Sequence, residues 1–411
     1  MATVALVGVL DTKGGEYAFL RDRVIEAGCE VVMINAGVLG DPDYAIDFDR
    51  REVAAEAGAD IDALAASGDR GAAVVAMAEG SASIVERLQE EGRIDGILGM
   101  GGSGSSSIIS AAMRRLPIGF PKILVSTMGA GDVSAFVGTS DIAMMYSVVD
   151  IAGINAVSSS ILGNAAAGIA AMAEANAGRV AANDGRPLIG ATMYGTTTPC
   201  VDRARAVLAE LGYEVLVFHA TGTGGRSMEA LMNSGYITGV LDVTTTELTD
   251  EVAGGTLTAG PDRLEAAGAL GLPQVVSIGA VDQITFTPQT AVPAEYRDRN
   301  VYDHNPSISL VRSNVEECTE LGRRMAEKLN AANGPVALFV PLRGSSSYAI
   351  EGAVFHDPEA DAALVESLRA HLEPSVELVE MDTDINNPVF ADAMAHRLDE
   401  YYRAWASHDE R

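Results

Sequence analysis

Several short segments rich in glycine, serine and threonine follow apolar runs directly, and they carry residues suited to binding an anion. One of them is HATGTGGRSME (219–229), which comes after EVLVF (214–218). A glycine-rich turn between a strand and a helix gathers backbone N–H groups at a helix N-terminus, where the helix dipole favours negative charge. We therefore expect a small anionic substrate here, held by Thr221, Gly222, Thr223, Gly224, Gly225 and Arg226.

Two side chains beside such turns have the chemistry of a general acid or base. His219 closes the apolar run, and Glu247 follows three threonines in TTTEL. We predict both as catalytic residues, with Thr245 and Thr246 as further substrate contacts. The alternatives are structural: a histidine satisfied at a strand end, and the first-turn acid of a capped helix.

The polar segment YRDRNVYDHNPSISLVRS (296–313) is expected to have no strand or helix at its centre. Long irregular segments inside compact domains are usually functional, so His304 is a candidate substrate contact. Motifs with the spacing of a zinc protease site, such as H-E-x-x-H, do not occur in the sequence.

The loop DTKGGE (11–16) combines a carboxylate, a hydroxyl, an ammonium and two glycines after the first apolar run. Asp11 is suited to hold Mg²⁺ through water, and Lys13 to neutralise a phosphate oxygen, where it would also be catalytic. The alternative is a helix N-cap formed by Asp11 or Thr12, with a solvated lysine.

GMGGSG (99–104) has the spacing of a dinucleotide fingerprint, through Gly99, Gly101 and Gly104. It does not stand on the first strand, however, and the next apolar run ends in Ser126 and Thr127 rather than in an acid. A partner for an NAD ribose is therefore missing, and a phosphate cradle is the better interpretation. A tight turn that merely needs glycine is the alternative.

These loops must be positioned by strands that alternate with helical patterns, as in a mainly parallel α/β sheet. The alternation restarts after the turn-rich NDGRP (183–187), which predicts two doubly wound domains, 1–184 and 185–411. The expected strands are 3–10, 30–35, 94–100, 122–127 and 141–148 in the first, and 187–193, 214–220, 237–243, 273–279, 335–341 and 376–381 in the second.

Composition excludes several classes of protein. The net charge of −29 makes binding of nucleic acid through a basic surface improbable. We expect no membrane segment, because no apolar run looks long enough, and no signal peptide at the N-terminus. The three cysteines are far apart, which argues against a disulfide framework. These features predict a cytoplasmic protein.

A family resemblance covers nearly the whole chain in order. LDTKGGEYAFL, GMGGSGSSS, PKILVSTMGAGD, DIAMMYSVVDIAGIN, TTPCVDRAR, EVLVFHATGTGGRSME, LDVTTTEL and DHNPSISLVRS together resemble the Tm-one-like ATP-binding proteins, a family named for a tomato mosaic virus resistance protein. The resemblance implies two Rossmann-like subdomains, ATP binding with Mg²⁺, and a homo-oligomer of two or more subunits. By motif, the ATP contacts would be Asp11, Thr12, Lys13, Gly14, Gly101, Gly102, Ser103, Gly104, Ser126 and Thr127.

Two functions are compatible with this resemblance. The first is an ATP- and Mg²⁺-dependent enzyme that acts on a small anionic metabolite between the two domains. The second is a nucleotide-gated module that binds a protein partner without turnover, since the plant member of the family blocks a viral replication protein. The chain departs from the family pattern at Asp384, where histidine is expected, and this leaves the 384–387 loop without an assigned role.

Overall fold

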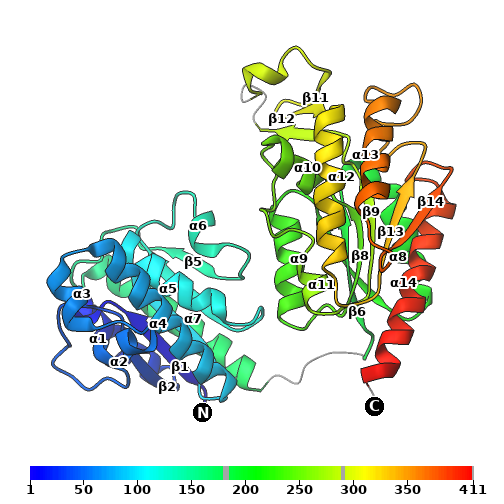
Figure 1. Ribbon diagram of the computed structural model, residues 1–411. Coiled ribbons are helices and arrows are strands. Elements are labelled where there is room, and N and C mark those ends of the chain that lie inside the picture. Colours follow the sequence, from blue (N-terminus) through cyan, green and yellow to red (C-terminus); the bar gives the residue numbers. More distant parts are fainter. Residues whose placement is uncertain (179–184, 288–291, 410–411) are drawn as a thin grey trace. The chain divides into compact units, whose positions relative to one another are not determined.

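The apolar runs form two parallel sheets in the computed structural model, which describes residues 1–178, 185–287 and 292–409. Each sheet belongs to one of two units, Met1–Ala182 and Asn183–Arg411. Helices cover both faces of each sheet (Figure 1). This confirms the predicted class, α/β with two Rossmann-like doubly wound parallel sheets.

The first sheet has the order β2-β1-β3-β4-β5, and all its neighbours are parallel. Its strands are β1 (Thr3–Gly8), β2 (Glu30–Asn35), β3 (Gly96–Gly101), β4 (Lys122–Ser126) and β5 (Ala143–Tyr146). The strand order reverses between β1 and β3, because β2 lies on one side of β1 and the later strands lie on the other. Ligands of doubly wound sheets bind at this type of reversal, outside the carboxyl ends of the strands.

Helices of the first unit bury apolar side chains in two cores, one on each face of the sheet. One core takes residues from α2 (Arg50–Glu56), α3 (Ile61–Ser67), α4 (Arg70–Glu90) and α5 (Ser103–Arg115). The other takes them from α1 (Leu10–Glu26) and α7 (Ala156–Ala177), while the short α6 (Ser134–Val137) precedes β5. The loop predicted at 11–16 is therefore helical, with a kink at Lys13 (φ −128°, ψ 20°).

Helix α7 corrects one expectation. Among the described residues it is the one helix long and apolar enough to cross a membrane, so the statement that no such run exists is wrong. Leu162, Ala166, Ile169 and Ala173 are nevertheless buried in the core beneath the first sheet. An apolar helix of this kind is equally typical of a protein core, and its composition decides nothing about a membrane.

The second sheet has the order β14-β13-β9-β8-β6-β7, again all parallel. Its strands are β6 (Leu188–Met193), β7 (Glu214–His219), β8 (Gly239–Thr244), β9 (Gln274–Gly279), β13 (Val336–Pro341) and β14 (Glu377–Met381). One face is covered by α8 (Thr198–Glu210), which follows the 3₁₀ turn η1 (Gly195–Thr197), and by α14 (Pro388–Asp409). The other carries α9 (Thr223–Asn233), α10 (Thr246–Ala253), α11 (Ala266–Ala269), α12 (Val315–Asn330) and α13 (Pro358–His371).

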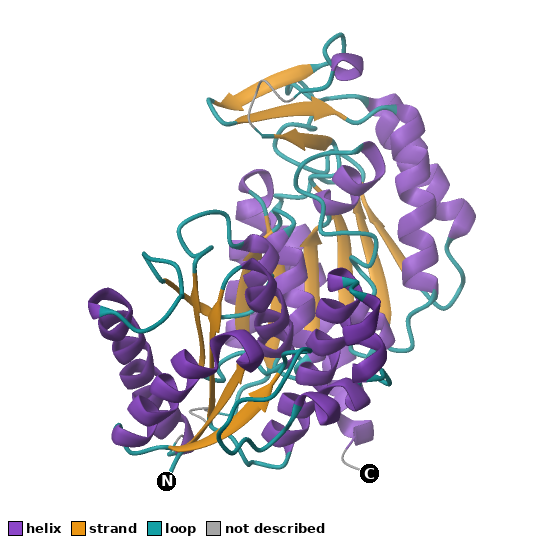
Figure 2. Cartoon of the chain, turned by 90° about the vertical axis from the view of Figure 1, so that its left-hand side faces the viewer, coloured by secondary structure: helices purple, strands orange, loops and turns teal. Residues whose placement is uncertain are grey.

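A small antiparallel sheet, β10-β12-β11, extends from the second unit (Figure 2). Its strands are β10 (Gln283–Phe286), β11 (Val301–Asn305) and β12 (Ile308–Arg312), with the 3₁₀ turn η3 (Ala294–Tyr296) before β11. The expectation that 296–313 has no strand at its centre is therefore wrong. β11 pairs with β12 along one edge, and its residues are mostly exposed. Because exposed strand residues need not be apolar, its polar sequence gives no strand pattern.

Candidate functional site

A cavity of about 560 Å³ opens at the strand-order reversal of the first sheet. The start of α1, the segment after β2, part of α3 and the starts of α4 and α5 enclose it. This geometry brings together two of the predicted loops. The lining residues are Val9, Asp11, Thr12, Lys13, Ala36, Gly37, Val38, Leu39, Leu64, Ala65, Gly68, Asp69, Arg70, Ala73, Val74, Met77, Gly102, Ser103, Gly104, Ser105, Ile108 and Asp150.

Helix α5 begins inside this cavity without a side-chain cap. Its N-cap residue is Gly102, which has no side chain to accept a hydrogen bond from the first amides of the helix. A Cβ on Gly101 would lie 2.3 Å from the Cβ of Ser105, so the turn can form only with glycine there. Uncapped amides at a helix N-terminus attract an anion. This arrangement is compatible with the predicted phosphate cradle.

The charged residues after β1 are partly engaged by the protein itself. Asp11 Oδ2 accepts hydrogen bonds from the amides of Val38 (3.0 Å) and Leu39 (2.8 Å), whereas its Oδ1 is buried without a partner. The Lys13 ammonium donates to the carbonyl of Ile151. Both side chains therefore tie loops together at the cavity wall, and one carboxylate oxygen is left unused.

Four other predicted nucleotide contacts have local roles. Ser126 is buried, and its Oγ lies 2.7 Å from Ser106 Oγ. The Thr127 amide donates to Gly101 (3.1 Å), the Thr12 hydroxyl to Val9, and the Gly14 carbonyl accepts from Tyr44. Ser126, Thr127 and Gly14 are not among the lining residues, whereas Thr12 is.

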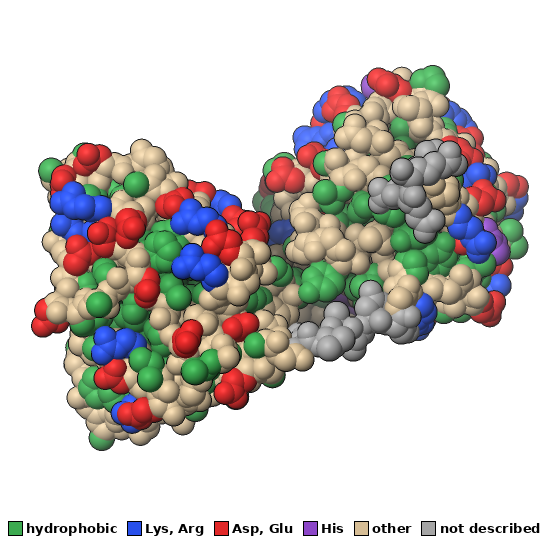
Figure 3. Space-filling view, turned by 90° about the horizontal axis from the view of Figure 1, so that it is seen from below, with side chains coloured by type: hydrophobic (Ala, Val, Ile, Leu, Met, Phe, Trp, Pro, Cys, Tyr) green, Lys and Arg blue, Asp and Glu red, His purple; other side chains and the backbone are tan. Residues whose placement is uncertain are grey.

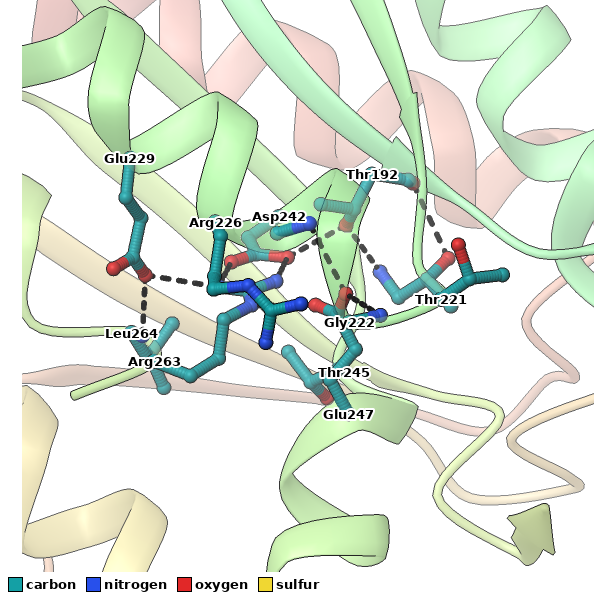
Figure 4. Close-up of polar contacts among 12 residues, drawn as sticks. Thr192, Thr221, Gly222, Arg226, Glu229, Asp242, Thr245, Glu247, Arg263 and Leu264 are labelled. Atoms are coloured by element: carbon teal, nitrogen blue, oxygen red, sulfur yellow. Dashed lines mark hydrogen bonds and ion pairs between the residues drawn. The ribbon is translucent and has the colours of Figure 1, made fainter. Parts of the chain in front are cut away.

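In the second unit, the glycine turn before α9 already holds an anion that belongs to the chain. Glu247 Oε1 accepts hydrogen bonds from the amides of Gly222 (2.6 Å) and Gly225 (3.0 Å), as Figure 4 shows for the labelled Gly222. A Cβ on Gly225 would lie 2.2 Å from Glu247 Oε2, so glycine is required for the carboxylate to approach. We predicted that this turn binds a substrate. In the structure, the amides of Gly222 and Gly225 are instead bound by the carboxylate of Glu247.

Glu247 is part of a buried ionic network (Figure 4). Arg263 donates from Nε to Glu247 (2.7 Å) and from both terminal nitrogens to Asp242 (2.6 and 2.8 Å). Asp242 also accepts from the Thr192 hydroxyl at 2.6 Å. Burial opposes the charge of Arg263, but the carboxylates of Asp242 and Glu247 raise its pKa above the ordinary value. Glu247 is therefore placed as a structural group, fully shielded from solvent.

The remaining candidates of the second unit are dispersed. The exposed ring of His219 stacks on Tyr194, with centroids 5.4 Å apart. The His304 ring contacts the Tyr348 hydroxyl at 3.1 Å from β11. Four others donate hydrogen bonds to backbone carbonyls: Thr221 to His219, Arg226 to Thr258, Thr245 to Ser277 and Thr246 to Gln283. The side chain of Thr223 is exposed. A Cβ on Gly224 would meet the carbonyl of His219, so this position requires glycine.

Sequence patterns missed three charged residues. Arg70 and Asp150 line the cavity of the first unit, and Arg263 is the centre of the buried network. Arg263 lies in GPDRLEAAG, which has no recognisable motif. The described residues contain no group of three or more His, Cys, Asp or Glu side chains arranged to hold a metal ion.

Asp250 on α10 should give the folded chain a pH-dependent stability. Burial raises the pKa of Asp250 from the usual 3.8 to about 7. Hydrogen bonds from the amides of Thr285 and Leu257 to the carboxylate lower the pKa, but by less than burial raises it. The folded state therefore keeps a proton between about pH 4 and 7 that the unfolded state loses, so stability should fall as pH rises through this window, by at most on the order of 4 kcal/mol.

Urea unfolding at several pH values measures this effect. The Asp250→Asn variant should lose the fall in stability, whereas Asp62→Asn, at an exposed residue, should keep it. An unchanged slope in Asp250→Asn would show that other groups cause any pH dependence in this range.

Comparison with known proteins identifies the family of the chain. Residues 2–178 match the N-terminal domain, and residues 186–402 the C-terminal domain, of the uncharacterised protein family UPF0261. A UPF0261 protein of Clostridium tetani is 49% identical over 396 residues, which cover 96% of this chain and 98% of that protein. Another, from Mesorhizobium japonicum, is 42% identical over 97% of this chain and 99% of its own length.

A plant relative shows the predicted resemblance. The ToMV resistance protein Tm-1(GCR237) of Solanum lycopersicum is 40% identical over 333 residues, 79% of this chain but 44% of the tomato protein. Among solved structures, UDP-N-acetylglucosamine 2-epimerase from Rickettsia bellii has a TM-score of 0.21 at 10% identity, over 67% of this chain and 78% of that one, too low to carry an argument. The matches to both domains and to these relatives show that the chain belongs to the UPF0261 family and is related to tomato Tm-1.

Proposed function

We propose that the cavity of the first unit binds ATP through its phosphate chain. The observation that carries the proposal is the uncapped N-terminus of α5, which opens into a cavity lined by two cationic side chains, Lys13 and Arg70. The cavity lies at the strand-order reversal, where doubly wound sheets bind ligands. Its volume of about 560 Å³ is in the range of small-molecule sites.

The wall of the cavity is suited to a nucleotide because it is polar in one part and apolar in another. Backbone amides of α5, Lys13 and Arg70 can hold phosphate oxygens. The apolar lining residues can cover a base: Val9, Val38, Leu39, Leu64, Val74, Met77 and Ile108. A ligand with a charged tail and a flat, weakly polar ring fits this division.

The donor set for Mg²⁺ is smaller. Magnesium bound with a nucleotide takes one or two carboxylates from the protein and further oxygens from the phosphates. Asp11, whose Oδ1 has no hydrogen-bond partner, and Asp150 are candidates in the cavity wall. These residues fit an ion that arrives with the nucleotide, and the ion would neutralise phosphate charge. A site for free Mg²⁺ would need more ligands.

Thermal unfolding with and without ATP–Mg²⁺ tests the proposal. A ligand that binds only the folded state at 100 times its Kd stabilises it by about 2.7 kcal/mol, which should raise the Tm by several degrees. Adenosine should give a smaller shift at the same concentration, because it lacks the phosphates. If millimolar ATP–Mg²⁺ leaves the Tm unchanged and calorimetry detects no binding, the proposal is wrong.

Turnover is the second part of the proposal. ATP held in this way would activate a small anionic metabolite by phosphoryl transfer, with positioning and charge neutralisation as the main contributions. The phosphoryl group passes to the metabolite and ADP is left, so ADP formation that appears only when a metabolite is added supports this reaction. The metabolite site itself has no support from the glycine turn of the second unit, whose amides are bound to Glu247.

That occupied turn favours the alternative, a nucleotide-binding module without turnover. Glu247, the predicted base, is fully buried and paired with Arg263, so it has no access to a substrate. Stabilisation by ATP combined with no ADP formation across a broad metabolite panel would support the module. The tomato relative is named as a virus resistance protein, which is compatible with binding to another protein.

A further inference from the structure

Cationic side chains are scarce in this chain, and acidic partners for them are plentiful. The sequence has 57 acidic residues and 28 lysines and arginines. On the surface in Figure 3, blue basic side chains mostly lie next to red acidic ones. A lysine or arginine without any partner is therefore an exception that needs a reason.

Arg70 is that exception. Across residues 1–178, 185–287 and 292–409, every other lysine and arginine makes a hydrogen bond or an ion pair within the chain. Within the same ranges the Arg70 guanidinium has neither. Its neighbour Asp69 is used instead to cap α4, by accepting a hydrogen bond from the amide of Ala72.

The position of Arg70 explains what it is free to bind. It is the first residue of α4, and its Nη2 lies 3.3 Å from the point where a Cβ on Gly104 would be. The guanidinium is therefore placed close to the uncapped first turn of α5, at the wall of the same cavity. Two independent sources of positive potential, one from α4 and one from α5, converge on one volume. Gly104 keeps that volume open.

We propose that Arg70 is the residue that reads the phosphate chain of the nucleotide, an inference that rests on the proposed ATP site. A guanidinium presents two parallel N–H donors that match two phosphate oxygens, and it keeps its charge at any physiological pH. Affinity should therefore rise with the number of phosphates because of Arg70. The residue is a specificity determinant for nucleoside triphosphates over monophosphates.

Titration calorimetry with ATP–Mg²⁺, ADP–Mg²⁺, AMP and inorganic tripolyphosphate tests the role of Arg70. In Arg70→Ala, affinity for ATP and for tripolyphosphate should fall about 10- to 100-fold, while affinity for AMP should change less than about threefold. Arg70→Lys should restore part of the loss, since it keeps the charge but not the paired donors. Arg93→Ala is the matched control, because Arg93 is also exposed, pairs with Glu91 and precedes β3 at the opposite end of the sheet.

The outcomes separate this inference from the proposed function. If the unaltered chain binds none of the four ligands, the ATP site itself is wrong. If it binds ATP and Arg70→Ala does too with unchanged affinity, Arg70 has no part in recognition. An equal loss for ATP and AMP would also overturn the inference, since it would place the guanidinium against a part that both share: the base, the sugar or the α-phosphate. Unchanged thermal unfolding of Arg70→Ala would exclude a folding defect.

Discussion

Replacing Arg263 by alanine should destabilise the second unit by about 3–5 kcal/mol, the usual consequence of breaking a buried ion pair by removal of one partner. Asp242 and Glu247 are both buried, and each depends on the guanidinium for charge compensation. Without it, two carboxylates would share a site with little access to water. Any movement of Glu247 would also disturb the turn before α9, because two amides of that turn donate hydrogen bonds to its carboxylate.

Differential scanning calorimetry and urea unfolding measure this loss. For a unit of this size we expect the Tm to fall by roughly 10 °C. Arg203→Ala is the matched control, because Arg203 forms an ion pair with Asp392 at the surface and should cost less than about 1 kcal/mol. A cost for Arg263→Ala as small as that of the control would show that the network contributes nothing to the fold.

Replacing Gly102 by aspartate should strongly weaken ATP binding in the first unit without loss of stability. Gly102 has extended backbone angles (φ −87°, ψ −166°) that any residue can adopt, and a Cβ there meets only Thr127 Oγ1, at 3.7 Å. Aspartate is a preferred N-cap residue, and its charge is favourable at this end of a helix. Its carboxylate would occupy the amides of α5 and repel the triphosphate, weakening binding by about 100-fold or more.

Asparagine at the same position separates the two effects. Gly102→Asn adds a cap of the same shape without a charge, so its loss of affinity should be much smaller than that of Gly102→Asp. Calorimetric titration gives the affinities, and the Tm of each variant without ligand should equal or exceed that of the original chain. Undiminished ATP binding in Gly102→Asp would mean that the nucleotide binds elsewhere.

The fold could be predicted because each parallel strand has a local signature. β1, β3 and β9 are apolar runs that end at a glycine- or acid-containing turn, and burial on both faces of the sheet makes such runs nearly continuous. The strand β11 lacks this signature, because a short strand that is mostly exposed needs no apolar pattern. Its existence depends on pairing with β12.

The site residues could be predicted only in part, because sequence shows which groups are present and not which groups meet. The segment HATGTGG predicted a turn that binds an anion, and the turn does bind one. The anion is Glu247, whose own segment TTTEL carries no sign of its partner, and Arg263 follows 16 residues later in an unremarkable stretch. Likewise, 34 residues separate Arg70 from Gly104, and their proximity depends on how α4 and α5 are placed on the sheet.

The carboxylate of Glu247 makes the two halves of the chain differ in whether they need an anion from solution. The half that contains α9 supplies its own counter-anion, so the amides of its glycine turn need none from solution. The other half leaves the amides of α5 open. Through the proposed site, its resistance to unfolding and proteolysis would rise and fall with the concentration of nucleotide around it, as mass action requires.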